Sequence, residues 1–188
     1  MRSASRRRTR SFRSPAGALL TLLAIGIIAV IAALVWPEPP AVTGRASAVD
    51  GDTLRIGGSR VRLVGLDAVE FDQTCMDAGG ADWPCGRDAR AFLDSLTRGG
   101  IAQCTASGRD RYRRILAHCA IDRSDLGEQI VRAGWAVAEL EYGLALADAR
   151  LNGRGIWSGH FIEPADWRRS HGEPGFDFMA WLMSLLGR

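Results

Sequence analysis

The chain contains one long uninterrupted apolar run, followed by a region in which polarity changes every few positions. Residues 16–36 carry no charged side chain, whereas residues 42–169 mix apolar, charged and turn-forming residues. A helix of about 20 apolar residues is long enough to cross the ~30 Å hydrocarbon core of a bilayer. The pattern therefore predicts a transmembrane helix at 16–36 and a folded domain at 42–169.

Within the folded region, β-type runs come first and helical patterns follow. Alternating or β-branched positions predict strands at Val42–Val49, Thr53–Ile56, Arg60–Leu66, Ile101–Ala106 and Ile115–Ile121. Apolar residues at helical spacing predict helices at Arg87–Thr97, Leu126–Gly134 and Leu144–Asn152. The polar stretch Phe71–Gly86 is expected to be a long surface loop. This order of elements predicts an α+β fold, a small and mostly antiparallel barrel or sheet with helices packed on it.

Positive charge is concentrated at the N-terminus. Residues 1–15 contain six arginines and no acid, so that 18 basic and 21 acidic residues remain in the rest of the chain. The formal net charge of +3 is therefore no argument for a nucleic-acid partner of the folded domain. By the positive-inside rule, the basic tail stays in the cytoplasm and the domain lies beyond the membrane, in the periplasm or outside the cell. A cleaved signal peptide is the alternative, and it too would export the domain.

The chain is thus expected to have five segments. They are a basic cytoplasmic tail (1–15), a transmembrane signal anchor (16–36), a proline-rich linker (37–41), the folded domain (42–169) and an apolar tail (170–188). We expect a single-pass protein of the cytoplasmic membrane. Within the tail, Phe176–Leu186 is too short to span a bilayer, and we expect a helix that docks on the domain or lies along the lipid surface.

The four cysteines agree with export. An even set in an exported domain favours disulfides, and their spacing lacks the close pairs of a zinc site. We expect the pairs Cys75–Cys85, within one loop, and Cys104–Cys119, across two neighbouring strands. Buried free thiols are the alternative.

Acids and one arginine mark the ends of the first predicted strands. Each has an ordinary explanation, since Asp-Gly is a common hairpin turn and strand-end acids are commonly solvated. Arg62, however, lies within an apolar run, where a charge is costly unless a partner meets it. If adjacent strands carry Asp52 and Asp67, their carboxylates converge at one rim of the barrel. Such oxygens, with a backbone carbonyl and waters, suit Ca²⁺.

A second charged group occupies the predicted turn Arg109–Arg114. Its ordinary interpretation is a solvated hairpin. Its functional interpretation is a phosphate clamp, because the forked guanidinium group matches phosphate oxygens.

Three ordered segments carry a family resemblance. Val49–Leu54, Val61–Glu70 and Asp110–Ala117 resemble the three signatures of staphylococcal-nuclease-like (thermonuclease) domains. The ending Asp166-Trp167-Arg168 is similar to the tryptophan-arginine ending of bacterial members, and the resemblance covers about residues 42–169. It implies an OB-fold, a five-stranded antiparallel β-barrel with three packed helices.

The resemblance also implies an activity, namely calcium-dependent hydrolysis of DNA or RNA to 3′-phosphate and 5′-hydroxyl ends. Matched by position, Asp52 and Asp67 would bind Ca²⁺ together with the backbone carbonyl of Ala68. Glu70 would be the general base or orient the attacking water. Arg62 and Arg114 would hold the scissile phosphate and stabilise the transition state.

Further residues are expected to contact the substrate, namely Arg111, Tyr112 and Tyr142. The chain departs from the family pattern where Val69 replaces proline and Arg113 replaces glycine. Two acids, Glu139 and Glu141, would repel a polyanion.

Two other functions remain open on the sequence. One is a non-catalytic nucleic-acid-binding OB module at a membrane, which the near-neutral body favours. The other is a structural spacer for partner proteins. We expect a monomer whose partners are the lipid bilayer and a DNA or RNA substrate.

Overall fold

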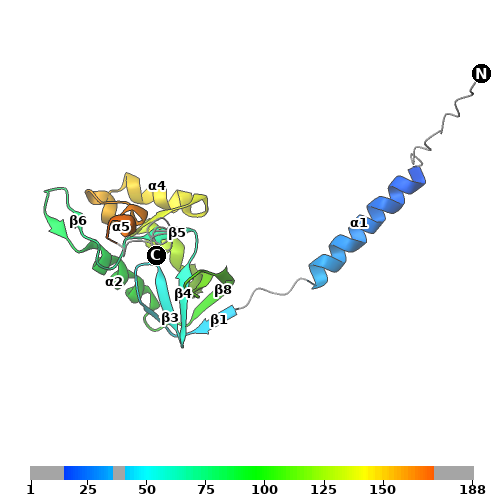
Figure 1. Cartoon of the computed structure of the whole chain (residues 1–188), viewed down its shortest axis with the longest axis horizontal. Helices are drawn as coiled ribbons and strands as arrows, with labels where there is room; N and C mark the ends of the chain where they lie inside the picture. Colours follow the sequence, from blue (N-terminus) through cyan, green and yellow to red (C-terminus); the bar gives the residue numbers. More distant parts are fainter. Residues whose placement is uncertain (1–14, 36–40, 172–188) are drawn as a thin grey trace, which may run out of the picture. The chain divides into compact units, whose positions relative to one another are not determined.

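The computed structural model describes residues 15–35 and 41–171 of the 188-residue chain. The chain divides into two compact units, Met1–Glu38 and Pro39–Arg188. The predictions for the basic tail up to residue 14, for linker residues 37–40 and for Phe176–Leu186 lie outside the described residues. Each unit is described by itself (Figure 1).

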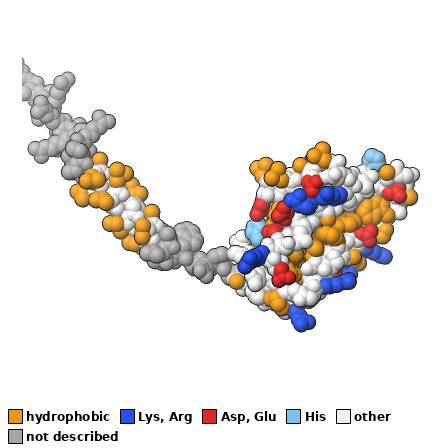
Figure 2. Space-filling model, turned by 180° about the vertical axis from the view of Figure 1, so that it is seen from behind, with side chains coloured by type: hydrophobic (Ala, Val, Ile, Leu, Met, Phe, Trp, Pro, Cys, Tyr) orange, Lys and Arg blue, Asp and Glu red, His pale blue; other side chains and the backbone are white. Residues whose placement is uncertain are grey.

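The first unit contains helix α1, Pro15–Val35. This helix coincides with the predicted apolar helix to within one residue at each end. Figure 2 shows hydrophobic side chains along its described part, whereas the second unit carries acidic and basic side chains among the apolar ones. Over the residues that the structure describes, no helix reaches the combination of length and apolarity needed to cross a membrane.

The second unit is built on a seven-stranded sheet. Six strands follow one another in the order β1-β8-β9-β4-β3-β2, and β10 pairs with the free part of β9. The strands are β1 (Ala41–Gly44), β2 (Ala46–Ala48), β3 (Thr53–Ile56), β4 (Ser59–Leu63), β8 (Ala102–Arg109), β9 (Ile115–Ile121) and β10 (Ser124–Asp125). Neighbours are antiparallel except for β4 and β9, which are parallel.

The sheet curls because its two edges come from one stretch of chain. β1 pairs with β8 at one edge and β2 pairs with β3 at the other, and only Arg45 separates the two strands in the sequence. The result is an α+β domain with a curled half-barrel sheet, which is consistent with an OB-like fold. The parallel β4–β9 pair and the seven strands differ from the expected five-stranded antiparallel barrel.

Within residues 41–171, the unit also contains four helices, two 3₁₀ turns and two strand pairs. The helices are α2 (Cys85–Thr97), α3 (Leu126–Arg132), α4 (Gly143–Leu151) and α5 (Pro164–His171). The 3₁₀ turns are η1 (Leu140–Tyr142) and η2 (Gly155–Ser158). The strand pairs join β5 (Leu66–Ala68) to β11 (Ala136–Ala138) and β6 (Cys75–Met76) to β7 (Asp82–Trp83). Helix α5 lies beside β5, although about a hundred residues separate them (Figure 1).

The core lies between the concave face of the sheet and helices α2 and α3. Strand β9 buries every second side chain, as expected for a strand with one face on the core. Leu54, Leu63, Leu93 and Ile130 are among its fully buried members. This burial anchors β3, β4 and β9, whose ends carry the charged residues of the site.

Both predicted disulfides are confirmed. Cys104 and Cys119 are direct partners in the β8–β9 register, with Cα atoms 4.0 Å apart. Cys75 and Cys85 join β6 to the first turn of α2. One bridge therefore cross-links the main sheet, and the other fastens the long segment that follows β5.

The main corrections to the predicted elements concern their interruptions. The run Arg60–Leu66 contains two strands, because β4 ends at Leu63 and Gly65 adopts a positive φ of 78° before β5 begins. The predicted loop Phe71–Gly86 contains the small β6–β7 pair, and helix α5 was not predicted. The periodicity of apolar residues along the sequence does not predict these interruptions, because they depend on contacts with distant segments of the chain.

Candidate active site

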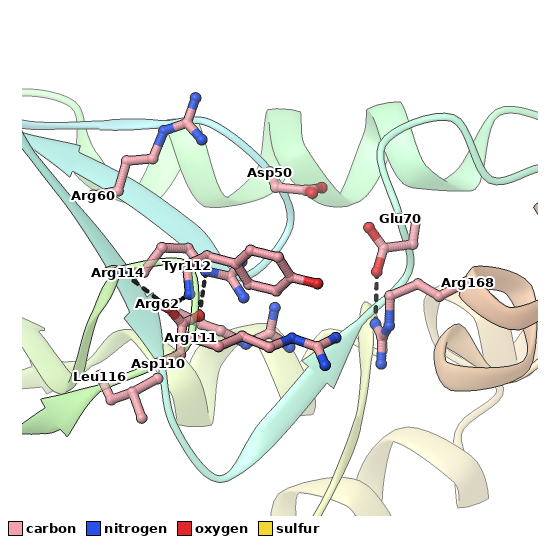
Figure 3. Close-up of a pocket in the computed structure, with 10 residues that line it drawn as sticks. All are labelled: Asp50, Arg60, Arg62, Glu70, Asp110, Arg111, Tyr112, Arg114, Leu116 and Arg168. Atoms are coloured by element: carbon pink, nitrogen blue, oxygen red, sulfur yellow. Dashed lines mark hydrogen bonds and ion pairs between the residues drawn. The ribbon is translucent and has the colours of Figure 1, made fainter. Parts of the chain in front are cut away.

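A cavity of about 640 Å³ opens where β4, the segment after β5, the β8–β9 turn and α5 meet (Figure 3). Charged side chains dominate its wall. The lining residues are Asp50, Arg60, Arg62, Glu70, Asp110, Arg111, Tyr112, Arg114, Leu116 and Arg168. The three predicted catalytic residues, Arg62, Glu70 and Arg114, therefore line one cavity.

Arg62 joins the two predicted metal ligands. Its Nη2 atom lies 2.7 Å from Oδ2 of Asp52 and 2.8 Å from Oδ1 of Asp67. The three residues come from the β2–β3 turn, β4 and β5, and the register Thr53↔Arg62 places the first two side by side. The predicted convergence of the two carboxylates thus occurs, around a guanidinium nitrogen.

Asp52 is held in a buried position by its own turn. Asp52 is only 4% exposed. Its Oδ1 atom accepts a hydrogen bond from the Thr53 hydroxyl at 2.7 Å, and its backbone carbonyl accepts one from the Leu63 amide. Burial raises the pKa of Asp52 to about 6, although the positive charge of Arg62 works in the opposite direction. Asp50, in the same turn, also has a raised pKa because of burial.

Arg168 reaches into the site from α5. Its Nη2 and Nη1 atoms donate to both oxygens of Asp67, at 2.8 and 2.9 Å, and Nη1 also donates to Oε1 of Glu70 at 2.6 Å. The hydrogen bond with Asp67, followed by that with Glu70, raises the pKa of Arg168 above its usual value. Asp67 and Glu70 are therefore joined by one guanidinium group.

The loop that carries Glu70 is fixed by contacts with Gln73 and with helix α2. The side chain of Gln73 is buried, and it accepts a hydrogen bond from the Glu70 amide at 3.1 Å and donates one to the Ile162 carbonyl at 2.6 Å. A Cβ atom at Gly86 would lie 1.7 Å from the Glu70 carbonyl oxygen, so α2 approaches the loop at a distance that only glycine permits. The backbone of Glu70 is thus fixed, although Val69 precedes it rather than proline.

On the opposite wall, the β8–β9 turn presents Arg114. Nε of Arg114 lies 2.7 Å from Oδ2 of Asp110, whose Oδ1 accepts hydrogen bonds from the Tyr112 and Arg114 amides. Loss of hydration acts to raise the pKa of Asp110, but the hydrogen bonds from Arg114 hold it below its ordinary value. Arg113 adopts a φ of 64°, the left-handed conformation that favours glycine, so the turn keeps this geometry without a glycine.

Tyr112 and Arg111 form the exposed edge of the cavity. Tyr112 is 65% exposed, and the guanidinium groups of Arg111 and Arg114 lie 4.8 and 5.5 Å from its ring centroid. An open aromatic ring beside two cations offers a stacking surface and a phosphate contact together. These two predicted substrate-binding residues lie at the cavity.

Tyr142 lies elsewhere. It is 7% exposed, its hydroxyl donates to Oδ1 of Asp125 at 3.2 Å, and it is not among the residues that line the cavity. Burial, followed by the negative charges of Asp125 and Glu141, raises its pKa above the usual value. Glu141 lies near His118, whereas Glu139 lines a second cavity that shares Arg62 and Arg168 with the first.

Whether calcium suits this site depends on its oxygen atoms. Asp52 and Asp67 supply the hard oxygen ligands that Ca²⁺ prefers, and a single positive centre, Nη2 of Arg62, already lies between them. Ala68, the third predicted ligand, is buried in β5. Within the described part of the chain, no group of three His, Cys, Asp or Glu side chains is arranged to hold a metal ion. The residue types therefore fit a divalent cation. In the described structure, Asp52 and Asp67 form ion pairs with arginine side chains instead.

Five lining residues were not predicted as site residues, namely Asp50, Arg60, Asp110, Leu116 and Arg168. All of these except Arg168 belong to segments that the sequence had already singled out. The signal for Arg168 was the tryptophan-arginine ending, which pointed to the family but not to a place in the site. Nothing in the local pattern of α5 indicates that it faces acids located about a hundred residues earlier.

Comparison with known proteins gives consistent matches. A family model described as staphylococcal nuclease homologue matches residues 60–159. The succinoglycan biosynthesis protein ExoI of Rhizobium meliloti (strain 1021) is 38% identical over 142 residues, which is 69% of this chain and 73% of that protein. An uncharacterized endonuclease of Haemophilus influenzae (strain ATCC 51907 / DSM 11121 / KW20 / Rd) is 28% identical over 149 residues, or 72% of this chain and 78% of that protein.

Proposed function

Because this chain belongs to the family of staphylococcal nuclease homologues, we propose that it is a nuclease that hydrolyses phosphodiester bonds of DNA or RNA in the cavity described above. The observation that carries the proposal is the meeting of Arg62, Glu70 and Arg114 around one cavity. A similarity to a protein named as an endonuclease supports the same reaction class. The products proposed from the family resemblance are 3′-phosphate and 5′-hydroxyl ends.

The residues of the cavity suit the steps of such a reaction. Glu70 accepts a proton from the attacking water or orients that water, which requires an ionised carboxylate beside the reacting phosphate. Arg62 and Arg114 contact the phosphate oxygens, where their charge opposes the repulsion between two anions as the transition state forms. Tyr112 and Arg111 hold the neighbouring nucleotide at the exposed edge.

We further propose that Ca²⁺ is the cofactor. The carboxylates of Asp52 and Asp67 would hold it, with the carbonyl of Ala68 as the third ligand named by the family resemblance. A bound cation polarises the phosphate and promotes ionisation of a water molecule. In the described arrangement, the cation would take the place of the Arg62 Nη2 atom between Asp52 and Asp67.

The first experiment measures cleavage by the full chain, purified in mild detergent with its disulfides intact. Single-stranded and duplex DNA and RNA are offered with Ca²⁺, with Mg²⁺ and with chelator. We expect cleavage with Ca²⁺ and none with chelator. Glu70→Gln is expected to lower kcat by about 10²–10⁴-fold, because an amide cannot accept the proton.

Glu163→Gln is the matched control, since Glu163 is exposed and lies outside the cavity. It should cleave like the parent protein. Equal activity of Glu70→Gln and the parent would refute the assigned role of Glu70. Absence of cleavage by a folded parent under every condition would refute the nuclease function.

A second candidate function is a non-catalytic nucleic-acid-binding module. It is favoured by the position of Glu139, whose acidic side chain lines the adjoining cavity of about 470 Å³ together with Arg62 and Arg168. An acid there would repel a phosphate from the catalytic Arg62, while the contacts offered by Arg111 and Tyr112 at the exposed edge stay available for binding. Metal-independent binding without cleavage would select this function over the first.

We also propose a location for the protein. The uncharged residues 16–36 and the basic tail before them support a single-pass protein of the cytoplasmic membrane with its domain outside. Carbonate extraction of cell membranes should leave such a protein in the pellet. A soluble mature form that begins near Ala41 would instead indicate a cleaved signal.

A further inference from the structure

We propose that Arg168 is a positioning residue for Glu70, so that helix α5 completes the active site. This inference rests on the proposed nuclease function. The family match ends at residue 159, before α5 begins at Pro164, and the inference therefore concerns a part of the chain that the match does not cover.

The first support is the geometry of the guanidinium group. Among the described residues, Arg168 is the one side chain that bonds the carboxylate of Glu70, and its Nη1 atom lies 2.6 Å from Oε1. The same planar group donates hydrogen bonds to both carboxylate oxygens of Asp67, at 2.8 and 2.9 Å. Because a guanidinium is rigid, these bonds fix the Glu70 carboxylate relative to Asp67.

The second support is a parallel contact to the backbone of the same loop. Gln73 is 1% exposed, and its amide group connects the Glu70 amide to the Ile162 carbonyl, at 3.1 and 2.6 Å. Ile162 lies just before α5, so two independent polar contacts connect the Glu70 loop to residues 162–168. One contact holds the backbone of Glu70 and the other holds its carboxylate.

The third support is the way in which the loop is packed. The close approach of Gly86 and the disulfide between Cys75 and Cys85 restrict the backbone around Glu70. Neither contact restrains the rotation of the carboxylate. A base must stand within hydrogen-bond reach of the water that it activates, and a small displacement lowers the rate sharply. Arg168 supplies the restraint that the backbone contacts cannot.

The next residue of the helix provides a matched control. Arg169 has the same side chain one position further along, but it pairs with Asp166 on the exposed side of α5 and does not line the cavity. Replacing it removes an arginine from α5 without touching Asp67 or Glu70.

The experiment compares Arg168→Gln, Arg168→Lys and Arg169→Gln, each in the parent protein and in the Glu70→Gln background. We expect Arg168→Gln to lower kcat by roughly 30- to 100-fold with KM changed by less than about threefold. Arg168→Lys should recover part of the loss, because an ammonium restores the charge but not the planar fork. Arg169→Gln should match the parent.

The double variant distinguishes positioning from direct substrate binding. If Arg168 acts through Glu70, its replacement costs less than about threefold once Glu70 is already glutamine. Effects that multiply fully, or a raised KM with unchanged kcat, would overturn the proposal in favour of a phosphate contact. Should Arg168→Gln fail to fold, the Lys variant carries the same comparison.

An activity-independent measurement keeps this inference separate from the proposed function. NMR relaxation of the Glu70 side chain should show larger-amplitude motion in Arg168→Gln than in the parent, and the same motion as the parent in Arg169→Gln. Equal side-chain motion in the two variants would overturn the positioning role even if the parent cleaves. A parent that does not cleave would refute the nuclease function, and the relaxation result would then decide whether Arg168 holds the Glu70 carboxylate.

Discussion

The two walls of the cavity are built differently. On the acid wall, Asp52 is buried, and Arg62 and Arg168 tie the carboxylates together through several bonds of 2.6–2.9 Å. On the arginine wall, the β8–β9 turn carries an exposed Tyr112 beside Arg111, and Arg114 is held by a single acid, Asp110. On the acid wall the carboxylates and Arg62 are largely shielded, and Arg168 is the exposed member, with its side chain 43% exposed. On the arginine wall Arg111 and Tyr112 are exposed, and Arg114 is half-buried.

We propose from this difference that each wall has a separate task. Charges taken out of water must be paired, and paired charges in a packed environment hold a defined geometry. Such a wall suits the chemical step, in which small displacements matter. Exposed guanidinium groups cost little to keep in water and meet a polyanion readily, but salt screens them. Such a wall suits substrate capture, with Arg114 at the boundary between the two tasks.

The largest expected effect tests Arg114 at that boundary. Arg114→Ala should lower kcat by roughly 10²–10³-fold, because it removes a preorganised donor to the phosphate. Single-turnover cleavage at saturating substrate measures this loss. Arg55→Ala is the matched control, since Arg55 is exposed on β3 and does not line the cavity. A rise in KM with unchanged kcat would mean that Arg114 contributes to substrate binding and not to the chemical step.

The next effect concerns the stability of the acid wall. The pKa of Asp52 is raised to about 6 by burial, so the folded state binds a proton more tightly than the unfolded state. Stability associated with this group therefore falls as pH rises from about 4 to about 6, and the penalty persists above pH 6. In chelator at pH 8, Asp52→Asn should raise the free energy of unfolding by about 1–3 kcal/mol.

Urea unfolding between pH 4 and 8 measures this difference. The gain should shrink as pH falls, because protonation neutralises the parent's carboxyl in both states. Asp82→Asn, at an exposed position of β7, should show no such pH-dependent gain. A variant less stable than the parent at pH 8 would mean that the ion pair with Arg62 outweighs burial.

The smallest effect belongs to the outer edge of the arginine wall. Arg111→Gln should raise KM by about three- to tenfold with little change in kcat, since it removes one exposed phosphate contact. The slope of log affinity against log salt for single-stranded substrate should fall in magnitude by about 0.7. Fluorescence anisotropy at several salt concentrations measures this slope. An unchanged slope would remove Arg111 from the substrate path.

Local patterns in the sequence predicted the parts of the fold that depend on near neighbours. Thr53–Ile56 and Ile115–Ile121 are strands with the predicted bounds, because alternation of side chains is a property of the strand itself. The Cys104–Cys119 bridge followed from two strands joined by a short turn. The motif residues Arg62, Glu70 and Arg114 were predicted as one site because the family resemblance covered their segments.

Other features depended on contacts that no local pattern records. The parallel pairing of β4 with β9 joins segments more than fifty residues apart, and the break at Gly65 serves the start of a second strand pair. Tyr142 was expected at the substrate because of its place in the family pattern. The fold instead buries its ring, where its hydroxyl meets Asp125.

By itself, the sequence determined the α+β class, the two disulfides and three of the charged residues that meet at the cavity, Arg62, Glu70 and Arg114. Spacing, turn residues and motif order are local quantities, so they can be taken from the chain directly. Only the tertiary structure decided that Arg168 of α5 joins Asp67 to Glu70, and that the two walls differ in exposure. The physical reason is that burial and ion pairing depend on which distant segments pack together, and the curled sheet and the docking of α5 establish those neighbours.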